Sequence, residues 1–287
     1  MKLKPISVRP HRSGKAEFLE VFQNTLQETI QISRQDPERL YHLRCSQIPY
    51  CANSVISNYG TRGMYFAMDL RMAYYVSVGH AVHAVMQSYL AESKRFIADY
   101  ECLECNTKYP LSRVSECCGF PTKYEEVSIN YKGIQGHIDG IFVDSQDRIW
   151  IVDYKTSSLL GAPLKVKNPP LNYRRQVRAY AYLLWKQHKI KVFGCMLVFL
   201  PRDKPWSPEV WEHRMGDQEY EDAKLELRKD RDLHRKTMKA STLEEMMALS
   251  KTKCMSEYCP ACKRSNSENK KLFTRLLKNP KLYPIKK

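Results

Sequence analysis

Residues 136 to 155 read GHIDGIFVDSQDRIWIVDYK and place Asp139, Asp153 and Lys155 in a β-like pattern. Short apolar runs lie on either side of a polar turn at residues 145 to 147, which predicts a β-hairpin. Asp153 and Lys155 are two apart, so they project from one face of their strand, and the neighbouring strand can bring Asp139 beside them. Two carboxylates that converge at a strand end bind Mg²⁺ or Mn²⁺, and a nearby lysine can orient water or stabilise charge on a phosphate.

An ordinary surface hairpin with charged residues is the alternative interpretation of this motif. The flanking segments favour the metal site. Upstream, GHAVHAVMQ places Gly79, His83 and Gln87 four apart, on one face of a helix from which His83 could supply an imidazole ligand. Downstream, Gln176 and Tyr180 in QVRAYAYLL lie one helical turn apart. Taken alone, His83 would be a core histidine and Tyr180 a core aromatic residue.

The spacing of apolar residues predicts helices around a β-rich centre. We expect helices over residues 15–34, 71–97, 173–188 and 217–239, and a loop over 158–171. The centre would hold a three-stranded meander over residues 123–155 and a buried strand in VFGCMLVFL, residues 192–200. A cysteine-bearing loop region with Pro110, Gly119 and Pro121, which has the composition of a small inserted module, precedes the meander. This order predicts an α/β or α+β fold with a mixed central sheet.

Composition bounds the class of protein. The 287 residues, 43% of them hydrophobic, can bury a large core. Forty-seven Lys and Arg against 31 Asp and Glu give a net charge of +16, which favours a polyanionic partner such as nucleic acid, although a basic surface can serve solubility alone. The sequence has no run of about 18 apolar residues and no secretory signal at its start, so we expect a cytoplasmic protein, in the host cytoplasm if viral, without membrane contact.

The four motifs, in this order, resemble the RecB-like branch of the PD-(D/E)xK nucleases. That branch has a GxxxH helix, a GxxD strand, a DxK strand and a QxxxY helix, and the match spans roughly Arg44 to Leu184. The resemblance implies a restriction-endonuclease-like α/β fold, with a central mixed β-sheet flanked by helices and a small Cys-rich insertion. It also implies a metal-dependent DNA nuclease that uses Mg²⁺ or Mn²⁺.

The resemblance implies roles for individual residues. His83, Asp139 and Asp153 would hold the metal, with the main-chain carbonyl of Tyr154 as a further ligand and Lys155 as the catalytic lysine. Two further residues, Gln176 and Tyr180, would position the active site or the DNA strand. Three arginines of the same helix could contact phosphates, although a solvated helix face explains them equally well: Arg174, Arg175 and Arg178.

Three nearby residues compete for these roles or extend them. Glu126, before Asp139, matches a frequent acidic position in the family. His80 competes with His83, but the glycine spacing selects His83. His137 should point to the face of its strand opposite to that of Asp139, and we do not expect it to be a ligand.

Ten cysteines in a cytosolic chain favour metal ligands or buried thiols over disulfides. The tail has C-x4-C-x2-C at Cys254, Cys259 and Cys262. Iron–sulfur relatives, including the CRISPR-associated exonucleases and the AddB-type helicase-nucleases, take a fourth cysteine from ahead of the GxxxH helix. RCSQIPYC resembles their RxSxxxxC segment, which implies Cys51 rather than Cys45 and a [4Fe–4S] cluster. Many relatives have C-x2-C-x5-C instead, so a zinc site with the same sulfurs, or three unligated tail cysteines, are alternatives.

A second cysteine group lies in CLECNTKYPLSRVSECCGF, residues 102–120. The group looks like a zinc knuckle followed by a second cysteine pair, with four candidate ligands: Cys102, Cys105, Cys117 and Cys118. Adjacent residues can bind one ion only in a restricted geometry, so three sulfurs with another ligand is an alternative. The zinc would fold the insertion or help to grip DNA.

These patterns divide the chain into four parts. We expect an N-terminal helical part at 1–98, a zinc-binding insertion at 99–122, a nuclease core at 123–240 and a C-terminal Cys-rich tail at 241–287 that packs on the N-terminal part. By analogy, the substrate would be single-stranded DNA or DNA ends, attacked exonucleolytically.

The setting would be recombination, repair or CRISPR-type DNA processing, in a cell or encoded by a phage. A helicase, recombinase or CRISPR-type protein could be the partner. Any ATP-driven motor would have to be a separate protein, because the sequence contains no Walker A motif. A catalytically silent DNA-binding subunit of a larger complex is the alternative, against which the intact DxK and QxxxY motifs argue.

Overall fold

The structure is a computed structural model. It describes residues 43–47, 50–52, 55–56, 70–91, 93–204, 207–251, 259, 261–262 and 265–278. The helix expected over residues 15–34 and the tail residue Cys254 lie outside these ranges.

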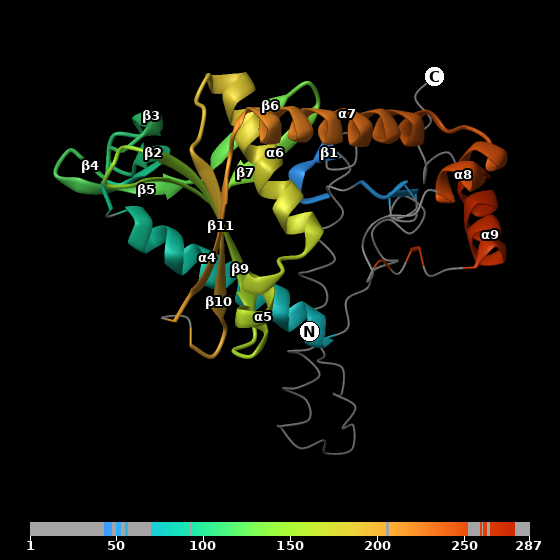
Figure 1. Ribbon diagram of the computed structural model, residues 1–287, viewed down its shortest axis with the longest axis horizontal. Helices are drawn as coiled ribbons and strands as arrows, with labels where there is room; N and C mark the ends of the chain where they lie inside the picture. The colour runs from blue at the N-terminus through green and yellow to red at the C-terminus, as the bar shows by residue number, and fades with distance from the viewer. Residues whose placement is uncertain are drawn as a thin grey trace, which may run out of the picture.

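The described residues form helices and strands along the whole core (Figure 1). The helices are α4 (Leu70–Ala91), α5 (Gly161–Lys167), α6 (Leu171–His188), α7 (Asp217–Lys239), α8 (Leu243–Ser250) and α9 (Asn266–Leu277), with a 3-10 turn, η1 (Cys45–Gln47). The strands are β1 (Leu43–Arg44), β2 (Phe96–Cys102), β3 (Lys108–Ser112), β4 (Glu116–Cys117), β5 (Phe120–Glu125), β6 (Val127–Tyr131), β7 (Ile134–Ile138), β8 (Gly140–Val143), β9 (Ile149–Ser157), β10 (Gly194–Pro201) and β11 (Glu209–Arg214).

The strands of the described part make two sheets. One has eight strands in the order β11-β10-β9-β8-β2-β5-β4, with β3 on β2, and the other has three in the order β1-β7-β6. β9 is parallel to β10, whereas β8 is antiparallel to β9 and β11 is antiparallel to β10. The sheet is therefore mixed, and the flanking helices confirm the α/β fold class.

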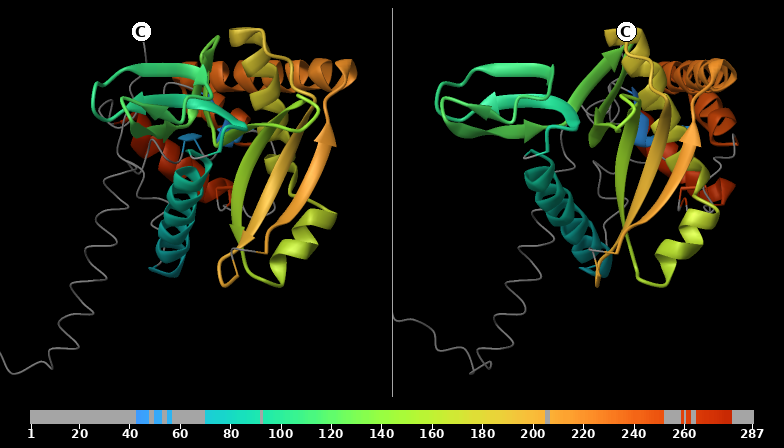
Figure 2. Two further views of the ribbon diagram at one scale, coloured as in Figure 1. Left: turned by 90° about the vertical axis from the view of Figure 1, so that its left-hand side faces the viewer. Right: turned by 60° about the vertical axis from the view of Figure 1, so that its left-hand side comes forward.

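β9 lies at the centre because its apolar run can be buried on both faces. Its residues alternate between two hydrophobic clusters: Ile151 packs in the cluster with the α6 residues Leu183 and Leu184, and Val152 packs in a cluster with Leu90 of α4. The helices α4 and α6 accordingly cover opposite faces of the sheet (Figure 2). None of the helices within the described residues has the length and apolar character needed to cross a membrane.

The structure differs from the sequence expectations at the cysteine-bearing segment. The expected helix over residues 71–97 ends at Ala91, because Phe96 and Ile97 pair with β8 and so begin a strand of the main sheet. The segment expected to be a loop is a set of antiparallel strands on the side of the view opposite α8 and α9, with α4 packed against β5 (Figure 1). The limits expected for the insertion, 99 and 122, fall inside β2 and β5.

Other differences are smaller. The expected three-stranded meander is five strands, β5 to β9, divided between the two sheets. The expected loop over 158–171 contains the short helix α5. The elements α6, β10 and α7 lie within two residues of their expected limits, whereas β11, α8 and α9 were not expected.

Candidate active site

The site begins where the two sheets separate. β8 pairs with β9 up to Gly140 and Val152, and the residue before Gly140 leaves toward β7 in the other sheet. Beyond Val152, β9 continues to Ser157 and is paired with β10 alone among the described strands. Its other edge is therefore open, and Asp139 lies at the start of that open edge.

Asp139 is held by backbone and side-chain hydrogen bonds. Its Oδ2 accepts a hydrogen bond of 2.8 Å from the backbone N–H of Tyr154. The Tyr124 hydroxyl donates to the main-chain carbonyl of Asp139, also at 2.8 Å. Burial, and then the nearby charge of Asp153, raise the pKa of the Asp139 carboxyl well above its usual value. A buried carboxyl beside another acid is a site that favours a bound cation.

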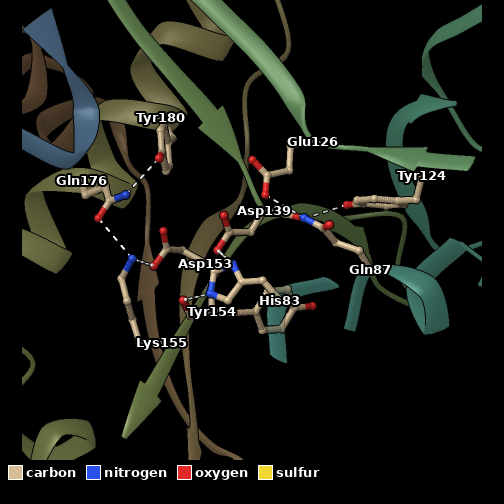
Figure 3. Close-up of polar contacts among 10 residues, drawn as sticks. All are labelled: His83, Gln87, Tyr124, Glu126, Asp139, Asp153, Tyr154, Lys155, Gln176 and Tyr180. Atoms are coloured by element: carbon tan, nitrogen blue, oxygen red, sulfur yellow. Dashed lines mark hydrogen bonds and ion pairs between the residues drawn. The ribbon is translucent and has the colours of Figure 1, made fainter. Parts of the chain in front are cut away.

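His83 approaches the same point from α4 (Figure 3). Its Nε2 lies 2.9 Å from the Tyr154 carbonyl oxygen, which can only accept, so Nε2 carries the hydrogen and donates. Nδ1 is then left as an acceptor, 3.7 Å from Asp139 Oδ2. Metal-binding histidines commonly donate their second N–H to a carbonyl in this way. Burial, and then Lys155, lower the pKa of His83, which keeps the imidazole neutral and able to bind a metal.

The two motif glycines differ in how closely they are enclosed. A Cβ at Gly79, in the GxxxH motif, would lie 3.4 Å from Thr156 Oγ1, which is an ordinary contact. A Cβ at Gly136, in the GxxD motif, would lie 2.6 Å from Cε1 of Tyr180 and 2.9 Å from Sγ of Cys45. The close approach of β7 to α6 and η1 therefore requires glycine at position 136.

Lys155 is fixed by a chain of polar contacts that reaches α6. Its Nζ lies 2.6 Å from Asp153 Oδ2 and donates to Gln176 Oε1 at 3.3 Å. Gln176 Nε2 in turn donates to the Tyr180 hydroxyl at 2.9 Å. Burial lowers the pKa of Lys155, but the charges of Asp153 and Asp139 outweigh it and the pKa is raised. The lysine is thus a partly buried ammonium with a fixed direction.

Glu126 is the residue that sequence reasoning valued too little. His83, Glu126 and Asp139 each place one ligand atom within 4.8 Å of the others. Gln87, the next residue on the helix face of His83, donates to Glu126 Oε1 at 2.7 Å. The i, i+4 spacing places Gln87 on the helix face of His83, but its contact with Glu126 depends on packing between distant elements.

The donor set fits a divalent cation. It combines an imidazole nitrogen with carboxylate oxygens, the ligands that Mn²⁺ and Mg²⁺ accept. Buried Asp153, only 1% exposed, has an oxygen Oδ2 with no hydrogen bond of good geometry and only the ion pair with Lys155. The Tyr154 carbonyl is engaged by His83, so its role as a further ligand stays a prediction.

A protein-family model matches a large part of the chain. The model of the PD-(D/E)XK nuclease superfamily matches residues 112–264, more than half of the chain, including Asp139, Asp153, Lys155 and the Gln176–Tyr180 helix. The chain belongs to the PD-(D/E)XK nuclease superfamily. No curated protein sequence is significantly similar to this chain.

Solved structures with a similar arrangement include that of SSO0001, with 15% identity and a TM-score of 0.41 over 85% of this chain and 97% of that one. The alkaline exonuclease LHK-Exo from Laribacter hongkongensis aligns with 11% identity and a TM-score of 0.37, over 71% of this chain and 92% of its own. Its complex with dAMP gives 11% identity and a TM-score of 0.36 over 69% and 90%. Membership of the superfamily rests on the sequence match.

Two of the three arginines of α6 contact the helix α7. Arg178 donates to both carboxylate oxygens of Glu226 on α7, at 2.9 and 2.8 Å. Arg175 Nε lies 3.2 Å from the same carboxylate. These two arginines tie α6 to α7, and only Arg174 makes no ion pair among the described residues. Phosphate contacts by the three stay a prediction.

The competing histidines lie apart from the donor set. His80 is exposed on α4. His137 is exposed as well, and its Nδ1 contacts Ser128 Oγ at 3.1 Å.

The four cysteines of the inserted strands come together. One sulfur from each of four residues lies within 4.8 Å of the others: Cys102, Cys105, Cys117 and Cys118. The adjacent pair can converge because Cys118 has a φ of 56°, in the left-handed region. Hydrogen bonding with Thr107 lowers the pKa of the Cys105 thiol to about 6, which favours the thiolate that binds metals.

A second sulfur group joins distant parts of the chain. Cys51 Sγ lies 3.7 Å from Cys259 Sγ and 3.5 Å from Cys262 Sγ. Cys45 lies elsewhere: its thiol is fully buried beneath Gly136, and this burial raises its pKa. The fourth expected sulfur, Cys254, is outside the described residues.

Proposed function

We propose that the chain is a metal-dependent deoxyribonuclease that hydrolyses phosphodiester bonds at the open edge of β9. The observation that carries this proposal is the convergence of a neutral imidazole, three carboxylates and a partly buried lysine there. His83, Glu126 and Asp139 supply ligand atoms within 4.8 Å of one another, and Asp153 holds Lys155 at 2.6 Å.

The proposed residues divide the work. A divalent cation held by His83, Asp139 and Asp153, with the Tyr154 carbonyl as an additional donor, would polarise the scissile phosphate and activate water. Lys155 directs its ammonium, fixed by Gln176, toward the charge that develops on the phosphate oxygens. The water oxygen bonds to phosphorus, the bond to the leaving oxygen breaks, and the proton of water ends on that oxygen.

Two substitutions test the hydrolysis. We expect Asp153→Ala and Lys155→Ala to lower Mn²⁺-dependent cleavage of end-labelled DNA by at least about 10²-fold, because each removes charge stabilisation of the transition state. Lys229→Ala, at an exposed position of α7, is the matched control and should retain full activity. Unchanged cleavage by the two site variants would end the proposal.

A second test concerns the acid beside His83. Glu126→Gln keeps the hydrogen-bond geometry with Gln87 and removes one negative charge. We expect it to raise the Mn²⁺ concentration needed for half-maximal cleavage. An unchanged Mn²⁺ requirement would exclude Glu126 from the donor set.

The mode of attack is proposed by analogy with the iron–sulfur nucleases that the sequence resembles. We propose exonucleolytic action on single-stranded DNA or DNA ends, in recombination, repair or CRISPR-type processing with a separate protein partner. A circular single strand distinguishes the modes, because its efficient cleavage would establish endonuclease activity instead. Metal-independent DNA binding without any cleavage would favour the alternative, a silent DNA-binding subunit.

The two sulfur groups are proposed as structural metal sites within the expected division of the chain. Cys51, Cys259 and Cys262, with Cys254, would hold a [4Fe–4S] cluster that ties the tail to the N-terminal part. The group in the inserted strands would hold Zn²⁺. An anaerobic preparation tests both: an iron-dependent visible spectrum and one equivalent of zinc are expected, and zinc in both groups would overturn the cluster.

A further inference from the structure

One face of α4 runs along β9 beyond the active site. Tyr75, Gly79, His83 and Gln87 are four apart and share that face. His83 meets the Tyr154 carbonyl and Gly79 lies against Thr156, two residues further along β9. Tyr75, one helical turn beyond Gly79, lies under the guanidinium of Arg202, 4.0 Å from its ring centroid. The row of α4 residues that includes His83 therefore ends, at Tyr75, beside the guanidinium of Arg202.

Arg202 lies just past the strands that carry the reacting centre. Lys155 pairs with Phe199 on β10, and Arg202 follows Phe199 by three residues, one residue past the end of β10. The backbone N–H of Arg202 donates to the Ser157 carbonyl at 2.9 Å, so its main chain stays beside the end of β9. Three strand residues span about 10 Å, and a stacked DNA strand advances about 3.4 Å per nucleotide. The separation corresponds to about three nucleotides.

A second cation lies near Arg202. Lys165, half-buried on α5, has its pKa lowered by burial and then by the charge of Arg202. α5 packs against β10, which leads directly into Arg202. Within the described residues neither cation forms an ion pair with a carboxylate, and exposed Asp203 in the same turn pairs with neither. Like charges that lie near each other repel, and a bound anion offsets that repulsion.

We propose that Arg202 and Lys165 bind a backbone phosphate of the DNA strand, about three nucleotides from the phosphate that is cleaved. This subsite rests on the proposed nuclease function and gives its substrate a second fixed point. Beside it, Tyr74 is 55% exposed, and its ring centroid lies 6.1 Å from that of Tyr75. An exposed aromatic ring next to a phosphate site suits stacking with an unpaired base, so the bound strand is single-stranded there.

The first test measures how salt affects binding of a single-stranded oligonucleotide in EDTA. We expect Arg202→Gln and Lys165→Gln each to weaken binding at every sequence and to reduce the slope of log affinity against log salt by about one. Arg228→Gln, at an exposed position of α7, is the matched control and should leave the slope unchanged. Thermal unfolding of each variant at the wild-type temperature verifies its fold.

The second test locates the phosphate. Oligonucleotides with one uncharged methylphosphonate linkage are moved along the strand, on both sides of the cleaved bond. Wild-type affinity should fall most for a linkage about three nucleotides from that bond, and Arg202→Gln should show no further fall at this linkage. Identical profiles for the two proteins would overturn the subsite.

The third test addresses stacking. Tyr74→Phe should keep single-strand affinity, whereas Tyr74→Ala should lower it by about fivefold to 100-fold, the loss of one stacked base. An abasic site opposite the ring should have the same effect on wild type. Equal affinity of all three proteins would remove the single-strand preference from the proposal.

The outcomes separate this inference from the proposed function. If wild type cleaves DNA but wild type and Arg202→Gln have the same methylphosphonate profile, the proposed nuclease function is retained and the phosphate subsite is rejected. The expected profile without any cleavage would retain the subsite and reject the hydrolysis. Absence of DNA binding by wild type would reject both.

Discussion

Replacing Gly136 with alanine should destabilise the protein and impair the active site together. The new Cβ would lie 2.6 Å from Cε1 of Tyr180 and 2.9 Å from Sγ of Cys45. Carbon atoms pack best at about 3.5 to 4.0 Å, so the tyrosine ring must move by about 1 Å. The ring cannot move alone, because its hydroxyl is the partner of Gln176, which in turn contacts Lys155.

Overpacking of a closed core by one methyl group costs about 1 to 3 kcal/mol. Chemical denaturation should therefore show Gly136→Ala unfolding at a lower denaturant concentration with an unchanged dependence on denaturant. Cleavage should also fall under conditions in which the variant is fully folded. Tyr180→Val removes the ring from the position of the new methyl, so the double variant should be less destabilised than the sum of the single variants.

A second glycine is the matched control. Gly79→Ala would bring its Cβ to 3.4 Å from Thr156 Oγ1, an ordinary contact, and alanine in a helix interior gains about 0.5 to 1 kcal/mol over glycine. We expect this variant to be at least as stable as wild type. Equal stability of Gly136→Ala and wild type would refute the packing argument at β7.

Three further predictions follow from the contacts described. Tyr124→Phe leaves the buried carbonyl of Asp139 without its hydrogen-bond donor. We therefore expect urea denaturation to show a free energy of unfolding lower by about 1 to 3 kcal/mol, and cleavage to need a higher Mn²⁺ concentration. Wild-type values for both would contradict this prediction. Cys51→Ser should lose bound iron in the anaerobic visible spectrum whereas Cys45→Ala retains it, and the reverse result would exchange their roles. Cys105→Ser should lower zinc content, measured by mass spectrometry, while iron is unchanged; full zinc retention would exclude this sulfur.

The fold centre could be predicted from the sequence because its signals are local. The continuous apolar run of β10 and the apolar periodicity of α6 placed both elements almost correctly. Two missed helices also had local signals. Thr242 with Glu245, and Ser265 with Glu268, are capping boxes that start α8 and α9, and they could have been recognised from their spacing.

The candidate site could be named but not assembled from the sequence. Strand alternation placed Asp153 and Lys155 on one face, and the structure brings Asp139 next to them. Alternation could not reveal that the chain changes sheets at Asp139, because this depends on pairing between distant strands. The hydrogen bond from His83 to the Tyr154 carbonyl depends on the same long-range packing.

The cysteine strands show a different limit. Pro110, Gly119 and Pro121 indicated a loop, yet β3, β4 and β5 form around them. Tertiary pairing overrides these local signals, because Phe96 and Ile97 attach the segment to the main sheet through β8. The convergence of the four cysteine sulfurs also favours this strand arrangement, and it could not be predicted from amino-acid composition.

A metal bound by the sulfurs of Cys51, Cys259 and Cys262 would also constrain the unfolded chain. The contacts among these sulfurs join residues 208 and 211 positions apart in the sequence. A metal or cluster held by these sulfurs would act as a cross-link that closes a loop of that length. In the chain-entropy model, such a closure removes about 5 kcal/mol of conformational entropy from the unfolded ensemble. Resistance to unfolding would then depend on the supply of metal as well as on the hydrophobic core.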